Sequence, residues 1–306
     1  MFARGRRGLT DRQRPAPARG TIGIVLHFES ASLRYRDTLA VDALTLTCHA
    51  GEVLGLLGPN GAGKSTTFAM ASGLLAPSGG RVRIDVDRSP AEARREGLIG
   101  AAPQALAIYP ELTGTENLVF FASLFGMRRR DAKRRAAELL ERVGLAQHAA
   151  KRAGRYSGGM ARRLNLAAAV MHDPRIVLLD EPTAGVDPHS RAAILDLVRD
   201  LAASGAAVLY TTHLIDEAQR LCDRVAVMDR GRVLALGDVE SLINSHGERP
   251  VVVVETKTGI ERVDADDPAA AVSALLGRSD VRGVRIDRPD LETVFLDLTG
   301  RSLRDA

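Results

Sequence analysis

The sequence predicts an α/β fold built on a parallel sheet with helices on both faces. Short apolar runs typical of fully buried strands alternate with segments of helical periodicity, as expected for a doubly wound sheet. A glycine-rich loop joins one such strand to a helix at residues 58–66, and the pattern changes near residue 105 and again near residue 247. We therefore expect the parallel core to carry an antiparallel β subdomain, a helical insertion and a small C-terminal α+β extension.

The first elements are strands. Side chains alternate between apolar and polar from Gly23 to Tyr35, and a second strand-like segment runs from Ala43 to Cys48. With the apolar run Val53–Leu57 they suggest an antiparallel edge that leads into the loop. The elements expected after the loop are a helix at Thr66–Leu75 and strands at Arg81–Val86 and Leu98–Ala102.

The helical insertion is expected at about residues 105–172. Apolar spacing predicts two helices between residues 114 and 144, and Ser157 stands at the N-cap of a third helix. The second helix has a basic face, which we expect to be a solvated surface, formed by Arg128, Arg129, Arg130, Lys133, Arg134 and Arg135.

The second half of the chain alternates strands and helices. The expected strands are Arg175–Glu181, Ala207–Tyr210, Arg224–Met228 and Arg232–Leu236, with helices from Pro188 and up to Leu221 between them. Beyond residue 247 we expect strands at Val251–Thr256 and Val281–Ile286 and helices at Pro268–Leu276 and Pro289–Thr299. The last helix has one apolar face. The expected units are thus an arm at 1–20, a main domain at 21–246 and an extension at 247–306.

Composition excludes several classes of protein. With 45% hydrophobic and 26% charged residues the chain is typical of globular domains. It has neither a run of 18 apolar residues nor an apolar segment after its N-terminus, which argues against a membrane span and a signal peptide and favours the cytosol. Cys48 and Cys222 lack metal-binding spacing, so we expect both to be small core residues.

The positive charge of the chain lies at its N-terminus. Residues 1–20 contain six arginines and one aspartate, a balance of +5, whereas the whole chain has +4, so the remainder is near −1. We expect this arm to be disordered, as a solvated tail or an artefact of the assigned start, with contact to anionic lipid as an alternative. No nucleic-acid partner is expected, because the body of the chain is not basic.

The loop at 58–66 has the pattern G-x-x-x-x-G-K-[ST]. Its residues are Gly58, Pro59, Asn60, Gly61, Ala62, Gly63, Lys64, Ser65 and Thr66. Between a strand and a helix this pattern is a P-loop, whose backbone N–H groups and helix N-terminus bind phosphate. Lys64 would reach the β- and γ-phosphates and Ser65 would bind Mg²⁺. A glycine-rich turn with a chance lysine is the alternative. The motif predicts a P-loop NTPase core of the RecA-like type.

Other polar residues follow the ends of predicted strands. Asp180 suits Mg²⁺ binding, and Glu181 is placed to polarise a water in line with the γ-phosphate, although the two acids could instead cap a helix. Gln104 and His213 follow two further strands on the same side of the sheet. Each alone is more often structural, but together an amide near Mg²⁺ and an imidazole near the γ-phosphate complete a hydrolytic site.

A second phosphate-binding element lies on the helical insertion. Ser157, Gly158 and Gly159 open a helix, where backbone N–H groups and a hydroxyl can bind phosphate. Its place in the chain is far from the P-loop. We therefore expect this element to bind the nucleotide of a partner.

Residues 22–245 resemble the ATP-binding subunit of an ABC transporter. The resemblance implies that Gly58–Thr66 is the Walker A loop, Gln104 the Q-loop, Ser157–Gly159 the signature, and Asp180 and Glu181 the Walker B acid and catalytic glutamate. Tyr35 would stack on adenine, although it could equally be a core tyrosine, and Asp187 and His213 match the D-loop and the switch histidine. Tyr156, Met160 and residues 184–186 depart from the usual motifs.

The resemblance also implies partners. Two copies would sandwich two ATP molecules head to tail, each between the Walker A loop of one chain and the signature of the other. The segment 289–302 resembles the C-terminus of daunorubicin-resistance-type ABC-2 exporter ATPases, which implies export of a hydrophobic drug-like or lipid-like solute. The chain would dock through Gln104 and residues 105–155 onto a separate membrane permease, at the cytoplasmic face of the membrane. A non-transport ABC-type ATPase and an ATP-sensing module without turnover are the alternatives.

Overall fold

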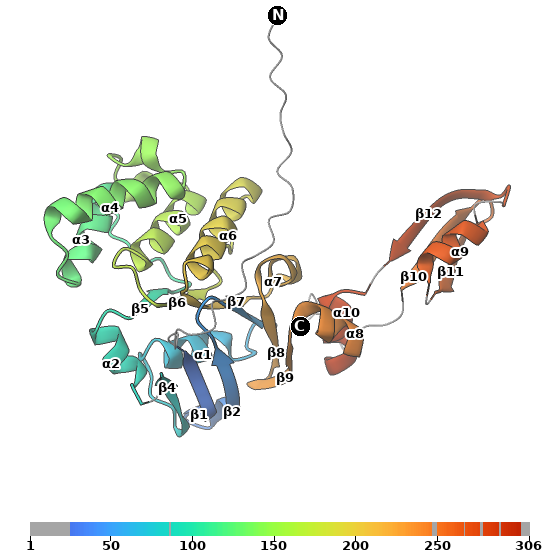
Figure 1. Cartoon of the computed structure of the whole chain (residues 1–306), viewed down its shortest axis with the longest axis horizontal. Helices are drawn as coiled ribbons and strands as arrows, with labels where there is room; N and C mark the ends of the chain where they lie inside the picture. The colour runs from blue at the N-terminus through green and yellow to red at the C-terminus, as the bar shows by residue number, and fades with distance from the viewer. Residues whose placement is uncertain are drawn as a thin grey trace, which may run out of the picture.

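The computed structural model describes residues 25–85, 87–246, 250–265, 267–275, 278–287 and 289–300 (Figure 1). The arm expected at residues 1–20 lies outside the described residues. Within those ranges, no helix combines the length and the apolar character needed to cross a bilayer. Cys48 and Cys222 are buried thiols, and burial raises the pKa of both.

A six-stranded sheet forms the centre of the main domain, in the order β5-β6-β7-β3-β8-β9. Its strands are β3 (Val53–Leu57), β5 (Ile99–Ala102), β6 (Ile176–Asp180), β7 (Ala207–Thr212), β8 (Arg224–Asp229) and β9 (Arg232–Gly237). The first five run parallel, and β9 is antiparallel to β8. Every residue of β3, β6 and β7 is buried, as their continuous apolar runs predict.

The two faces of this sheet belong to two different hydrophobic clusters. Alternate residues of β6 divide between them: Val177 and Leu179 pack with one cluster, and Ile176 and Leu178 with the other. The first cluster is completed by α5 (Gly158–Ala169), α6 (Pro188–Ala203) and α7 (Ile215–Leu221), and the second by α1 (Lys64–Ala71) and α2 (Pro90–Arg95). The doubly wound core predicted from sequence is therefore confirmed.

A second, antiparallel sheet packs on the α1 side of the core (Figure 1). It consists of β1 (Leu26–Tyr35), β2 (Thr38–Cys48) and β4 (Gly79–Ile84), in the order β2-β1-β4. We expected β1, β2 and Val53–Leu57 to form this antiparallel edge, and the third of these segments is wrong. The segment Val53–Leu57 forms β3 inside the parallel sheet, and β4 pairs with β1 instead. Full burial of β3 on both faces suits the centre of the larger sheet.

The helical region lies on the other side of the central sheet (Figure 1). It contains α3 (Gly114–Leu124), α4 (Arg129–Arg142), the short 3₁₀ turns η1 (Ala146–His148) and η2 (Ala153–Arg155), and α5. The buried face of α4 is formed by Ala132, Ala136, Leu139 and Leu140. The opposite face carries the arginines, most of which are exposed, as the sequence predicts.

The C-terminal residues divide between two places. Strands β10 (Val251–Thr256), β11 (Ile260–Asp264) and β12 (Val281–Asp287) form a three-stranded sheet that packs on α9 (Pro268–Leu275) around a small core of its own. The last helix, α10 (Leu291–Thr299), packs instead on α7 and on α8 (Val239–His246). Neither β11 nor α8 was expected from sequence. We expected residues 247–306 to form a single unit, but the last helix of this extension packs on the main domain.

The apolar face of α10 should contribute measurably to stability. Phe295 is fully buried in the large core cluster, so Phe295→Ala removes its packing and leaves a cavity. We expect the free energy of unfolding to fall by about 3–5 kcal/mol in urea denaturation. The exposed neighbour Leu296 is the matched control, and Leu296→Ala should change it by less than about 0.5 kcal/mol. Equal effects of the two variants would contradict this packing.

Candidate active site

The candidate site lies where the parallel strands end. β3 leads into the loop at Gly58, β6 ends at Asp180, β7 ends at Thr212 and β5 ends at Ala102. Because these strands are parallel and adjacent in the sheet, their carboxyl ends meet at one edge. The four segments that carry the predicted polar residues are thereby brought together.

Two glycines let the loop fit between neighbouring strands. A Cβ at Gly58 would lie 2.3 Å from the carbonyl oxygen of Met228, and one at Gly63 would lie 2.7 Å from that of Ala40. Gly63 also has a φ of +101°, in the region that favours glycine. Ala40 belongs to the β1–β2 hairpin, whose tip carries Tyr35 with 49% of its surface exposed. Tyr35 is therefore half-exposed on the hairpin that approaches the loop at Ala40.

Lys64 is buried beside the loop that precedes it. Its Nζ donates to the carbonyl oxygens of Gly58, at 2.7 Å, and Pro59, at 2.9 Å. Nζ also lies 3.4 Å from Glu181 Oε1. Burial lowers the pKa of Lys64, and the neighbouring Glu181 carboxylate opposes that shift. The ammonium group is thus held at the floor of the loop, with only 4% of the side chain exposed.

Two hydroxyl groups converge on Asp180. Ser65 Oγ lies 3.3 Å from Asp180 Oδ1 and donates to it, and Thr211 Oγ1 donates to the same oxygen at 2.6 Å. Asp180 is buried at the end of β6. A serine hydroxyl beside a carboxylate is a pair of hard oxygen ligands, the donor set that Mg²⁺ prefers. The chemistry of these two residues therefore fits the metal that the sequence predicts.

Three predicted side chains meet at the Glu181 carboxylate. In addition to Lys64, His213 Nδ1 lies 3.1 Å from Oε1, and Gln104 Nε2 donates to Oε2 at 3.4 Å. Glu181 is only 8% exposed and has a φ of +45°, an unusual backbone conformation for a residue with a side chain. Its backbone N–H donates to Thr211 Oγ1 at 3.0 Å, which helps to fix this conformation.

The signature element lies on α5 and contacts the start of α6. Ser157 caps α5 by accepting from Met160 N, and a Cβ at Gly159 would lie 3.0 Å from Asp187 Oδ2. Asp187 caps α6 through Ser190 N, at 2.9 Å, and this backbone hydrogen bond lowers the pKa of the Asp187 carboxyl. Among the described residues, no hydrogen bond or ion pair joins Ser157–Gly159 to the loop at Gly58–Thr66.

Two residues that sequence reasoning missed hold the segment around Gln104. Arg162 donates to the carbonyl oxygen of Gln104. Asn165 accepts from Ala107 N at 2.9 Å and donates to the carbonyl oxygen of Pro103 at 3.4 Å. Both lie on α5, and Asn165 is buried. A polar residue within the apolar body of α5 was the available signal.

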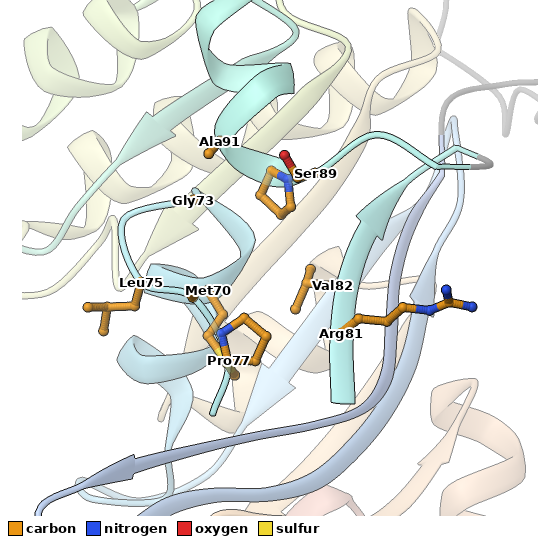
Figure 2. Close-up of a pocket in the computed structure, with 10 residues that line it drawn as sticks. Met70, Gly73, Leu75, Pro77, Arg81, Val82, Ser89 and Ala91 are labelled. Atoms are coloured by element: carbon orange, nitrogen blue, oxygen red, sulfur yellow. The ribbon is translucent and has the colours of Figure 1, made fainter. Parts of the chain in front are cut away.

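A pocket of about 230 Å³ lies elsewhere and takes no part in this site (Figure 2). Met70, Pro77 and Val82 line it, near the C-terminal end of α1 and along β4. None of the predicted site residues lines it. The P-loop precedes the opposite end of α1.

The fold and the loop geometry are those of a P-loop nucleotide-binding protein. A family model described as ABC transporter matches residues 41–184. Over 92% of the chain, two relatives are named as ATP-binding proteins, one for linearmycin resistance and one for Nod factor export. The chain belongs to this family and is an ATP-binding, ATP-hydrolysing subunit of an ABC transporter.

Two relatives illustrate the likeness. The linearmycin resistance ATP-binding protein LnrL of Bacillus subtilis is 36% identical over 314 residues, covering 92% of this chain and 100% of that protein. The Nod factor export ATP-binding protein I of Burkholderia orbicola is 38% identical over 301 residues, covering 92% of this chain and 98% of that protein. Both likenesses extend beyond the matched domain into the C-terminal residues.

Solved structures agree with this fold. An ATP-binding subunit of an ABC transporter superimposes with a TM-score of 0.66 at 30% identity, covering 73% of this chain and 93% of that one. The bacterial ABC transporter cassette MJ0796, solved as a dimer, superimposes with a TM-score of 0.64 at 26% identity over 70% of this chain and 98% of its own. MJ0796 has also been solved in a post-hydrolysis state with ADP and phosphate. ABC ATPase domains act as dimers and work with membrane components of the transporter.

Proposed function

We propose that two copies of this chain bind two Mg²⁺-ATP head to tail and drive export of a hydrophobic drug-like or lipid-like solute through a separate membrane permease. One observation carries the proposal. Lys64, Gln104 and His213 meet at the Glu181 carboxylate, whereas the signature Ser157–Gly159 lies at the start of α5 and, within the described part of the chain, makes no hydrogen bond or ion pair to that site. A hydrolytic centre on one chain therefore needs the signature of another chain to cover its nucleotide.

The loop would bind the phosphates of the nucleotide. Backbone N–H groups between Asn60 and Thr66 at the N-terminus of α1 would bind the phosphates, and Lys64 would place its ammonium group between the β- and γ-phosphates. Tyr35, exposed at the hairpin tip, stacks on the adenine. Ser65, Asp180 and the Gln104 amide would hold Mg²⁺, which when bound neutralises charge on the phosphate oxygens.

Hydrolysis would depend on the groups around Glu181. Its carboxylate accepts a proton from the attacking water, in line with the γ-phosphate. His213 Nδ1 lies 3.1 Å from that carboxylate, and the other ring nitrogen of the imidazole would bond a γ-phosphate oxygen. Gln104 donates to the other oxygen of this carboxylate. It would therefore connect the group that binds the water to the ligands of Mg²⁺. Burial of Lys64 and Glu181 strengthens the ion pair between them, because water screens it little.

The second copy would supply Ser157, Gly158, Gly159 and Asp187. The hydroxyl of Ser157 and the first N–H groups of α5 then bind the γ-phosphate held by the partner's loop. Asp187 lies against Gly159 at the start of α6, so it reaches the same interface. ATP would act as the contact that closes the dimer, and its hydrolysis would open it.

The permease would dock on the segment that follows Gln104. Tyr109, Phe120 and Phe121 form an aromatic cluster, with ring centroids of Tyr109 and Phe120 4.8 Å apart, and Tyr109 and Phe120 are 45% and 36% exposed. A groove of about 400 Å³ between α3 and α4 continues this surface. Exposed aromatic residues beside a groove are typical of protein interfaces.

Export is supported by the relatives. One is named for linearmycin resistance and another for Nod factor export. The C-terminal segment 289–302, which resembles drug-exporter ATPases, agrees with this direction of transport. We place the chain at the cytoplasmic face of the membrane, where ATP is available and the permease presents its cytoplasmic loops.

This proposal predicts co-purification with an integral membrane protein. A tagged chain isolated from detergent-solubilised membranes should recover a polytopic permease, and Phe120→Asp should reduce that recovery while ATP hydrolysis by the isolated chain persists. Leu74→Asp, which alters another exposed apolar residue just after α1, should leave recovery unchanged. Recovery with nucleic acid or ribosomes alone, and with no membrane protein, would contradict the transporter assignment.

A further inference from the structure

Glu217 is a buried carboxylate that the site described above does not use. It lies in the first turn of α7, four residues after His213, and only 2% of it is exposed. A buried carboxylate is costly unless hydrogen bonds or an opposite charge stabilise it. Its partners therefore show what holds it there.

Three hydroxyl groups donate to one oxygen of Glu217. Thr183 Oγ1 and Tyr210 Oη lie 2.8 Å from Oε2, and Thr212 Oγ1 lies 3.1 Å from it. Arg191 Nε lies 3.3 Å from the other oxygen, Oε1, and forms an ion pair with it. Burial and the neighbouring Glu217 charge raise the pKa of Tyr210 well above its usual value. The carboxylate thus collects donors from β7, α6 and the segment after β6.

Two of these partners adjoin residues of the candidate site. Thr183 follows Glu181 by two positions. Thr212 directly precedes His213, and Thr212 Oγ1 also accepts from Leu214 N at 2.9 Å. The residues before and after His213 are therefore both held by hydrogen bonds of this hydroxyl.

Arg191 connects the carboxylate to α6. It lies one turn after Asp187, the residue that caps this helix, and its backbone N–H donates to the Asp187 carbonyl oxygen at 2.9 Å. Glu217 therefore ties together the segments that carry Glu181, His213 and Asp187.

We propose that Glu217 is a positioning residue for ATP hydrolysis. It fixes the segments after β6 and β7 relative to each other, so that the Glu181 carboxylate and the His213 imidazole stay in register, and it links both to the interface residue Asp187. The inference rests on the proposed roles of these three residues. A displacement of about 1 Å in a catalytic group can cost about 100-fold in rate, so such a support affects turnover more than nucleotide binding.

Two substitutions of matched shape test this role. In Glu217→Gln the amide end keeps the size of the carboxylate, but its nitrogen donates and its single oxygen lacks the negative charge that attracts three hydroxyls and Arg191. Thr212→Val keeps the branched shape of Thr212 and replaces the hydroxyl by a methyl group, which removes its bonds to Glu217 and to Leu214 N. Thr212→Ser restores the hydroxyl and serves as the rescue variant.

Glu52 provides the matched control for loss of a buried acid. It is 8% exposed and pairs with Arg224 at 3.0 Å, but it lies just before β3, at the end of the sheet opposite the site. Glu52→Gln therefore perturbs a similar ion pair without touching the segments that carry Glu181 or His213.

The measurements are kcat, the affinity for a fluorescent ATP analogue and the thermal melting temperature of the full chain. We expect Glu217→Gln and Thr212→Val to lower kcat at least about 10-fold while affinity changes by less than about two-fold. Thr212→Ser should return kcat to within about three-fold of the wild type. Glu52→Gln should match Glu217→Gln in any loss of melting temperature but keep the wild-type kcat.

Unchanged kcat in Glu217→Gln, or an equal loss in Glu52→Gln, would overturn the inference. If Glu217→Gln does not fold, the Thr212 pair decides: equal rates in Thr212→Val and Thr212→Ser overturn it. Glu181→Gln in the same assay separates this inference from the proposed site. Wild-type turnover in Glu181→Gln would refute the site itself, whereas loss in Glu181→Gln with full turnover in Glu217→Gln would refute only the role of Glu217.

Discussion

Replacing Glu181 by Gln should reduce ATP turnover by about 100- to 10,000-fold, the range that positioned general bases contribute. The amide keeps the shape of the side chain and its contact distance to Gln104, but it cannot accept a proton from the attacking water. Nucleotide binding should persist, because Lys64 and the loop are unchanged. Phosphate release with Mg²⁺-ATP measures the turnover, and a fluorescent ATP analogue measures the binding.

Glu52→Gln is a suitable control for this experiment, since it neutralises a buried glutamate at the other end of the sheet. It should keep the wild-type rate. Turnover of Glu181→Gln at the wild-type rate would exclude Glu181 as the base, and a wild type without any turnover, even beside its permease, would favour the ATP-sensing alternative.

Replacing Lys64 by Ala should remove most of the nucleotide affinity. The buried ammonium group donates to two loop carbonyls, 2.7 and 2.9 Å away, so it is held beside the loop that would bind the β- and γ-phosphates. Hydrogen bonds to charged groups contribute about 1.5–3 kcal/mol, so the dissociation constant should rise by about 10- to 150-fold. Calorimetric titration with ATP measures it.

Lys133→Ala gives the comparison for Lys64→Ala, because Lys133 is an exposed lysine on α4, away from the strand ends. Its removal should leave ATP affinity unchanged. An affinity of Lys64→Ala within about two-fold of the wild type would mean that the loop binds something other than a polyphosphate.

Much of the candidate site is local in sequence. Gly58–Ser65 forms one contiguous motif, and Asp180 and Glu181 end an apolar run that reads as a buried strand. Gln104 and His213 were expected beside them because parallel strands end at a common edge, and the structure places their side chains 3.4 and 3.1 Å from the Glu181 carboxylate. Such residues are far apart in the sequence, and the order of the strands in the sheet brings them together.

The network around Glu217 was not predictable in the same way. Thr183, Arg191 and Glu217 come from three elements, and each residue type is ordinary in its own segment. Their convergence depends on how α6 and α7 pack across β7, which periodicity does not reveal. Only the burial of Glu217 distinguishes it from a solvated residue of a short helix.

The fold itself was predicted better than its pairings. Alternating strands and helices indicated the doubly wound core, but β4 rather than Val53–Leu57 completes the antiparallel sheet. Likewise, the apolar face of α10 was visible in the sequence, yet its partners, α7 and α8, were not. An apolar face in the sequence predicts that a helix packs against other elements. Which elements these are depends on tertiary packing.

The molar mass of Glu181→Gln tests most directly whether two copies of the chain share the site. Light scattering with Mg²⁺-ATP should give about twice the 32.7 kDa of one chain, and a single chain mass without nucleotide. Adding Ser157→Arg to this variant should return the mass to that of one chain while ATP still binds. A single chain mass for Glu181→Gln at saturating ATP, or a dimer that survives Ser157→Arg, would contradict a site closed by the partner's signature.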